Sequence, residues 1–177
     1  SADGLAGLVL DLRNNPGGLL TSSVEVADKF LYQGNIVSTR GRKPHEAFRY
    51  DAHLAGTWRV PLVVLIGGES ASASEIFAAA IRQNHRGTVV GSRSYGKGSV
   101  QGIFPLGAGR SGIRLTTAKF YSPNGNPISK VGVNADIIVH KVSRPVDDQG
   151  TGGSLTHQSD DVLNAGISAA RSKLASR

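Results

Sequence analysis

Hydrophobic residues along this chain fall into two alternating patterns. Short, nearly continuous apolar runs occur at residues 7–12, 61–66 and 88–91, as expected for strands buried on both faces. Between them, apolar residues at helical spacing predict helices over 19–31 and 72–84. The order strand, helix, strand, helix, strand predicts an α/β fold in which at least part of the sheet is parallel.

The second half of the chain is more strand-rich and ends in a helix. Further strands are predicted at 35–38, 47–50, 100–106, 114–121 and 136–140, several of them bounded by glycine or polar turns. A final amphipathic helix should start at a cap, Ser159 or Asp160, and run to about Ala175. We therefore predict one core over residues 1–142, a polar linker or loop over 143–158 and a C-terminal helix over 159–177.

Composition narrows the class of protein. The 177 residues suit one domain, and the longest apolar stretch is too short to span a bilayer. The absence of methionine anywhere suggests a mature product or an excised fragment. The absence of cysteine excludes disulfides, thiolate metal sites and cysteine nucleophiles.

The formal net charge of +7 raises the question of nucleic acid. The basic residues are scattered, however, and the one cluster, at 40–43, has no aromatic residues interleaved with it. A solvated hairpin edge explains that cluster better, and we expect no nucleic-acid partner. The five histidines lack metal-ligand spacing, so we expect no metal cofactor.

The candidate catalytic residues lie at the start of the second predicted helix, in the segment Ser70-Ala71-Ser72-Ala73-Ser74-Glu75. Ser72 and Glu75 match the Ser-x-x-Glu capping box, which is the common structural role for such residues. The same position lies at the carboxyl edge of the sheet, where α/β active sites form. The helix N-terminus also offers free N–H groups, including that of Ala73, to a developing negative charge.

A candidate partner for Ser72 is Lys97, which lies 25 residues later between two glycines. A serine activated by a lysine hydrolyses amides without histidine. To act as a base the amine must be uncharged, and apolar surroundings, here from Tyr95 or Phe104, favour that form. The alternative is an exposed turn lysine, since lysine is seldom buried.

Three competing motifs are weaker. Residues 91–98 nearly match a phosphate-binding P-loop, but Gly98 replaces the magnesium-binding hydroxyl and a strand follows. Residues 94–97 spell Ser-x-x-Lys, which needs a helical turn that the flanking glycines disfavour. A Ser–His–Asp triad through His85 or His140 has no motif to support it.

Besides the Ser72 segment and Lys97, a third segment with candidate active-site residues follows the first predicted strand. It is Asp11-Leu12-Arg13-Asn14-Asn15-Pro16-Gly17-Gly18. Its glycines fit either a simple strand-to-helix turn or a turn whose N–H groups complete an oxyanion hole opposite Ser72. The residues alone leave these two interpretations open.

Taken in order, five segments resemble the carboxy-terminal processing peptidases, also called tail-specific proteases. They are the segments at 11–18, 70–75, 96–101, 115–125 and 132–136, where Ala135 replaces the family's common proline. The resemblance implies a Clp-protease/crotonase-like core of ββα units. It also implies that Ser72 is the nucleophile, Lys97 the general base and Gln101 the residue that orients the lysine amine. Backbone N–H groups of Gly18 and Ala73 would form the oxyanion hole, and no metal is needed.

The resemblance carries further expectations. Family members have an upstream PDZ domain and an earlier part of the core, both absent here, so the chain is expected to be an N-terminally truncated fragment. Expected partners are polypeptides with accessible C-termini, with an adaptor, self-association and at most peripheral membrane contact as further possibilities. The expected location is extracytoplasmic, in the periplasm or cell envelope. An inactive peptide- or ligand-binding module and a crotonase-like acyl-CoA enzyme remain alternatives.

Overall fold

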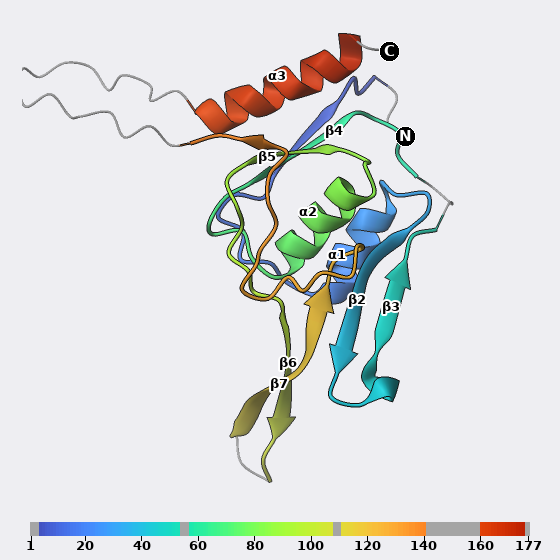
Figure 1. Ribbon diagram of the computed structural model, residues 1–177, viewed down its shortest axis with the longest axis vertical. Helices are drawn as coiled ribbons and strands as arrows, with labels where there is room; N and C mark the ends of the chain where they lie inside the picture. The colour runs from blue at the N-terminus through green and yellow to red at the C-terminus, as the bar shows by residue number, and fades with distance from the viewer. Residues whose placement is uncertain (1–3, 54–56, 108–110, 141–159, 176–177) are drawn as a thin grey trace, which may run out of the picture.

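The computed structural model describes residues 4–53, 57–107, 111–140 and 160–175, in which two four-stranded sheets pack with three helices (Figure 1). The first sheet is parallel, in the order β1 (Leu8–Asp11), β4 (Leu62–Ile66), β5 (Thr88–Gly91), β8 (Ile137–Ile138). The second is antiparallel, in the order β3 (Phe48–Asp51), β2 (Asn35–Gly41), β7 (Gly112–Tyr121), β6 (Ser99–Pro105). The helices are α1 (Leu20–Asp28), α2 (Ala73–Gln83) and α3 (Asp161–Ala175), and a 3-10 turn, Pro44–Glu46, precedes β3.

The parallel sheet lies between two layers of helices, which explains the apolar runs of its strands. In β4, Leu62, Val64 and Ile66 belong to the main core with α2, whereas Val63 and Leu65 pack with Ala170 of α3. All five side chains are buried, because alternate positions of a strand face opposite sides of a sheet. Figure 1 shows α3, in red, on the opposite side of this sheet from α2.

The antiparallel sheet closes the other side of the main core. Val37 of β2 and Phe120 of β7 are buried there with Phe30 and Phe77, whose rings meet edge to face at 6.0 Å. The β6–β7 hairpin projects from the body of the molecule and carries exposed apolar side chains, among them Ile103 at 74% exposure (Figure 1).

The predicted α/β class and the order of the elements are confirmed. The first helix ends at Asp28, earlier than expected, because the N–H groups of Phe30 and Leu31 both bond to the Ala27 carbonyl and turn the chain. Phe30 and Leu31 nevertheless keep their apolar role, since both are buried. The sequence pattern did not indicate that the strands divide into two separate sheets.

The final helix begins at the predicted cap. The Asp160 carboxylate accepts the Leu163 N–H at 3.0 Å, which is the bond expected of an N-cap aspartate. Ser159, the other candidate cap, and the predicted linker at 143–158 lie outside the described residues. None of the helices in the described part of the chain has both the length and the apolar content needed to cross a membrane.

An ion-pair cluster joins the start of α3 to the end of β1. The Arg13 guanidinium binds Asp160 at 2.6 Å and Asp11 at 2.6 Å, across 147 residues of sequence in the first case. Hydrogen bonding from Arg13 holds the pKa of both the Asp11 and the Asp160 carboxyls below their usual range. Because Arg13 directly precedes residues 14–18, the cluster anchors that turn to α3.

This cluster predicts a loss of stability in acid. Since the folded-state pKa of each carboxyl is lowered, its contribution is complete above the unfolded pKa, about 4, and is lost as the pH falls through the folded value. We expect the urea midpoint of the wild type to fall from pH 6 to pH 3 by more than that of Asp160→Asn. Both carboxylates are about two-fifths exposed, so the difference should be modest.

The matched control is Glu25→Gln, which removes an exposed carboxylate on α1 that forms no ion pair within the described residues. Its pH dependence should follow the wild type. A pH dependence of Asp160→Asn that is equal to that of the wild type would show that the cluster contributes nothing.

Candidate active site

The turn between β4 and α2 places Ser72 at the carboxyl edge of the parallel sheet. Buried Ser70 holds this turn: its hydroxyl donates to the Leu12 carbonyl at 2.7 Å and accepts the Gly67 N–H at 2.9 Å. The ends of β4 and β1 are thereby tied together. Ser72 follows as the N-cap of α2, half-buried, with its side chain at the helix N-terminus.

Ser72 adopts a backbone conformation that is rare for a residue with a side chain. Its φ is 54° and its ψ is −116°, outside the ordinary left-handed helical region. Such a conformation costs on the order of 1–3 kcal/mol and persists where surrounding contacts enforce it, often at active sites. A strained serine on a sharp strand-to-helix turn is also the geometry of the nucleophile elbow in α/β hydrolases.

Residues 14–18, the turn between β1 and α1, lie directly against Ser72. At Gly17, φ is 101°, and a Cβ would come 2.6 Å from the Ala71 oxygen and 2.9 Å from the Ser72 Cβ. The backbone carbonyl of Asn15 accepts the Ala71 N–H at 3.1 Å, and its side chain accepts the Gly17 N–H at 2.9 Å. Only glycine fits position 17, so the turn is built for close approach to the serine.

The two predicted oxyanion-hole donors are placed on either side of this contact. Ala73 N lies 2.7 Å from the position a Gly17 Cβ would take, and Gly18 is the next residue along the turn. In the part of the chain that the structure describes, neither N–H has a protein acceptor. The Ala73 carbonyl is fixed by the Ser23 hydroxyl at 2.8 Å. The structure thus brings Gly18 and Ala73 to the neighbourhood of Ser72, with Gly17 as the point of closest contact.

Glu75 joins the turn that carries Ser72 to the irregular segment at 92–98, which contains Lys97 and which we call the lysine loop; the capping-box motif alone does not indicate this role. Its side chain is fully buried, and one carboxylate oxygen accepts the backbone N–H of Ser72 at 2.9 Å and that of Lys97 at 2.8 Å. The other accepts the Ser94 hydroxyl at 2.5 Å and the Gly96 N–H at 2.6 Å. The bond to Ser72 is the half of the capping box that the sequence predicted, but the three bonds to residues 94–97 link segments that sequence spacing cannot relate.

The lysine loop places the backbone of Lys97 beside Ser72 but leaves its side chain in solvent. The backbone nitrogens of Ser72 and Lys97 share one Glu75 oxygen, so they lie within the sum of those two distances of each other. The Lys97 side chain is exposed, as is Tyr95, so the shielding considered from Tyr95 and Phe104 is not formed. Among the described residues, the Lys97 amine forms no hydrogen bond with Ser72.

Gln101 lies in β6, with an exposed side chain that makes no hydrogen bond within the described ranges. The loop leading to it is held on its other side by residues 128–133. Lys130 N–H donates to the Gly96 carbonyl at 2.8 Å, and Gly98 packs on the Ser129 backbone. These close approaches explain why glycine flanks the lysine.

The competing motifs do not form the structures that they need. Residues 92–98 are irregular and are followed by the strand β6, so neither the P-loop helix nor the Ser-x-x-Lys helical turn is present. Ser94 binds Glu75 instead of serving as a nucleophile. Across the described residues, no three His, Asp or Glu side chains gather in a way that could hold a metal ion.

Comparison with known proteins agrees with the motifs. The family model for peptidase family S41 matches residues 1–139. The carboxy-terminal-processing protease of Bartonella bacilliformis is 52% identical over 140 residues, covering 78% of this chain and 32% of that protein. The carboxyl-terminal-processing protease of Synechocystis sp. is 39% identical over 175 residues, covering 90% of this chain and 40% of that protein. This chain therefore spans between a third and two-fifths of the length of these relatives.

A solved structure supports the same assignment. The photosystem II D1 C-terminal processing protease superposes with a TM-score of 0.69 at 38% identity, covering 77% of this chain and 35% of that one. The Clp-protease-like fold expected from the resemblance is thus confirmed. The strained Ser72 of the present chain, its adjacent glycine turn and its five ordered motifs agree with these matches. The matches show that the chain belongs to peptidase family S41.

Proposed function

We propose that this chain carries the catalytic residues of a serine peptidase that cleaves polypeptides at or near their C-terminal ends. The observation that supports this most strongly is the strained Ser72, with the N–H groups of Ala73 and Gly18 left without protein acceptors beside it. A nucleophile flanked by two free N–H donors is the arrangement that acyl transfer requires.

In the proposed reaction, the uncharged Lys97 amine accepts the Ser72 proton as Oγ bonds to the peptide carbonyl carbon. The carbonyl electron pair moves to oxygen, where the N–H groups of Ala73 and Gly18 stabilise the anion, each by about 3 kcal/mol. Collapse breaks the C–N bond, and Lys97 protonates the leaving amine. Lys97 then takes a proton from a water whose oxygen bonds to the ester carbonyl carbon. Collapse breaks the bond to Ser72 Oγ, which takes that proton back from Lys97, and releases the carboxyl product. Gln101 orients the amine.

Because the Lys97 side chain is exposed, we propose that a bound peptide completes its surroundings. In this proposal, a peptide lying across Ser72 also covers the exposed Lys97 side chain, so that the amine and the serine hydroxyl meet at the bound peptide. The backbone bond from Lys97 to Glu75 keeps the loop in place while the side chain moves.

The proposed function also includes a cellular location and a class of substrate. Relatives named carboxy-terminal-processing proteases come from bacteria, and a C-terminal processing peptidase from a chloroplast is 37% identical. We infer an extracytoplasmic location, polypeptide substrates with accessible C-termini, and contact with further domains of the full-length protein.

One observation favours the alternative of an inactive peptide-binding module. The Lys97 amine and the Ser72 hydroxyl share no hydrogen bond within the described residues, as expected of a chain that binds but does not cleave. Membership of family S41 argues against the acyl-CoA enzyme. Covalent labelling separates the remaining two.

We expect a fluorophosphonate probe to label Ser72 in the full-length protein, because only an activated serine reacts quickly with it. Lys97→Met should slow labelling by roughly a hundredfold or more, which is the usual contribution of a general base. Mass spectrometry of the labelled peptide identifies the site. The matched control is Lys119→Met, which removes an exposed lysine on β7 and should label at the wild-type rate.

Unlabelled Ser72 in a folded full-length protein, or equal labelling of wild type and Lys97→Met, would contradict the Ser–Lys assignment. The first result would favour the binding module. The second would call for a different base.

A further inference from the structure

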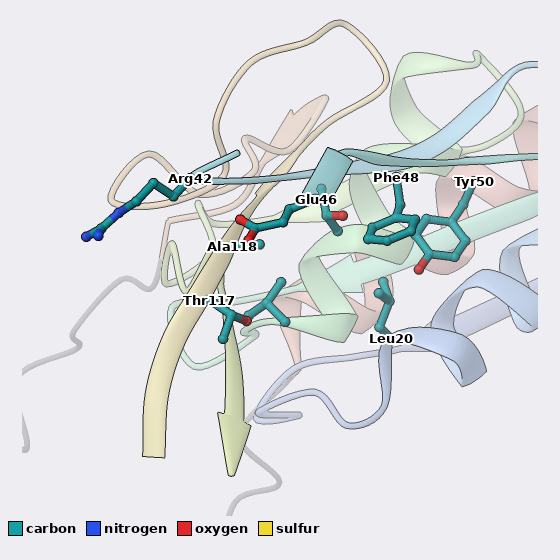
Figure 2. A pocket seen from close by; sticks show the side chains of 9 residues that line it. Leu20, Arg42, Glu46, Phe48, Tyr50, Thr117 and Ala118 are labelled. Atoms are coloured by element: carbon teal, nitrogen blue, oxygen red, sulfur yellow. The ribbon is translucent and has the colours of Figure 1, made fainter. Parts of the chain in front are cut away.

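A cavity of about 490 Å³ opens between the antiparallel sheet and the start of α1 (Figure 2). Most of its wall is carbon, and we call it the Leu20 pocket. Its lining residues are Leu20, Thr39, Arg42, Glu46, Phe48, Tyr50, Val100, Thr117 and Ala118. A volume of this size is ample for a large aliphatic or aromatic side chain, and lies within the range of small-molecule pockets.

Two charged residues, Arg42 and Glu46, also line the pocket. The Glu46 carboxylate accepts the backbone N–H of Lys43 at 3.1 Å, so it is engaged within its own turn. Figure 2 shows the Arg42 side chain directed away from the other lining residues. In the same view Leu20 points toward the rings of Phe48 and Tyr50. The interior therefore selects an apolar occupant.

Two walls of the pocket continue directly into the candidate active site. Leu20 comes two residues after Gly18, at the end of the turn that lies against Ser72. Val100 comes three residues after Lys97 and directly precedes Gln101 in β6. Both walls are thus two or three residues along the chain from segments that flank Ser72.

We infer that the Leu20 pocket receives a large apolar side chain of the peptide held at Ser72, and so sets the preference of the enzyme for such residues. This inference rests on the proposed function, because the occupant belongs to the substrate. The lining residue that best tests it is Ala118, because its side chain is the smallest in the lining and the ring of a larger residue would fill the space beside it.

The experiment uses binding to the full-length Ser72→Ala protein, so that it does not depend on catalysis. The probes are fluorescein-labelled peptides of glycine, serine and alanine residues, each with one phenylalanine at a successive position, and the all-small parent. At the position nearest the pocket, phenylalanine should lower the dissociation constant by roughly tenfold or more relative to the parent peptide. Apolar pockets discriminate between large and small side chains by about this amount.

Filling the pocket should remove this preference. We expect Ala118→Phe to bring the phenylalanine peptide to the affinity of the parent peptide, while Lys119→Phe, on the opposite face of β7, leaves the tenfold difference intact. Thr117→Leu provides a second filling variant should Ala118→Phe unfold, which circular dichroism reports.

Equal affinity for all the peptides, or a phenylalanine preference that survives in the folded filling variants, would overturn the pocket assignment. Failure of the proposed function has a different signature, since Ser72 would stay unlabelled by fluorophosphonate in the wild type. A preference that is lost in the filling variants, with Ser72 unlabelled, would support the pocket and refute the peptidase.

Discussion

Ser72→Ala is expected to abolish peptide cleavage while leaving the protein folded. Alanine lacks the hydroxyl that bonds to the peptide carbonyl, and loss of a serine nucleophile lowers kcat by roughly a thousandfold or more. The change in unfolding free energy should stay within about 1 kcal/mol, the usual contribution of an N-cap side chain. Cleavage of an unstructured peptide by the full-length protein, followed by chromatography, measures the first effect, and urea unfolding measures the second.

Ser72→Gly serves as the control for the backbone of this residue. Glycine has no Cβ to oppose a φ of 54°, so this variant should be equally inactive but more stable than Ser72→Ala by about 1 kcal/mol. Residual cleavage by either variant at the wild-type rate would show that Ser72 is not the nucleophile. Equal stability of the two variants would show that the conformation stores no strain.

The elements around the site were predictable because their hydrophobic patterns are local. The run at 88–91 predicts β5 with the bounds that the structure has, and the helix over 72–84 differs from α2 by one residue at each end. Packing on both faces of one sheet imposes such patterns on the chain itself. The catalytic roles of Ser72, Ala73 and Lys97 stay predictions, because motifs mark these residues but contacts between distant segments bring them together.

What the sequence could not supply are contacts between distant segments. Nothing in the pattern distinguishes Gly17 from Gly18, yet only Gly17 meets Ala71 and Ser72 at distances that exclude a side chain. The pairing of Arg13 with Asp160 spans 147 residues, and the linker between their elements carries no signal for it. Side-chain exposure is also set by tertiary packing, which is why the shielding of Lys97 could be considered but not predicted.

Glu75→Ala is expected to destabilise the protein by roughly 4 kcal/mol or more, because it leaves four donors without an acceptor. Each buried donor left unpaired costs about 1–3 kcal/mol, and a domain of this size has only about 5–15 kcal/mol in total. The carboxylate is fully buried, so water does not replace it readily. Urea unfolding of the full-length protein measures the loss, and fluorophosphonate labelling of Ser72 should fall with it.

The variant Glu75→Gln tests whether the site needs the Glu75 carboxylate or only a polar side chain at this position. In Glu75→Gln, an amide NH₂ replaces one of the two oxygens, and each oxygen accepts at least one backbone N–H, so at least one backbone hydrogen bond is lost. We expect this variant to fold with reduced stability and to label slowly, since the backbones of Ser72 and Lys97 no longer share an acceptor. Glu69→Gln, in the same strand-to-helix turn but exposed, should behave as the wild type. Wild-type labelling by a folded Glu75→Gln would show that the shared carboxylate does not position the serine and the lysine.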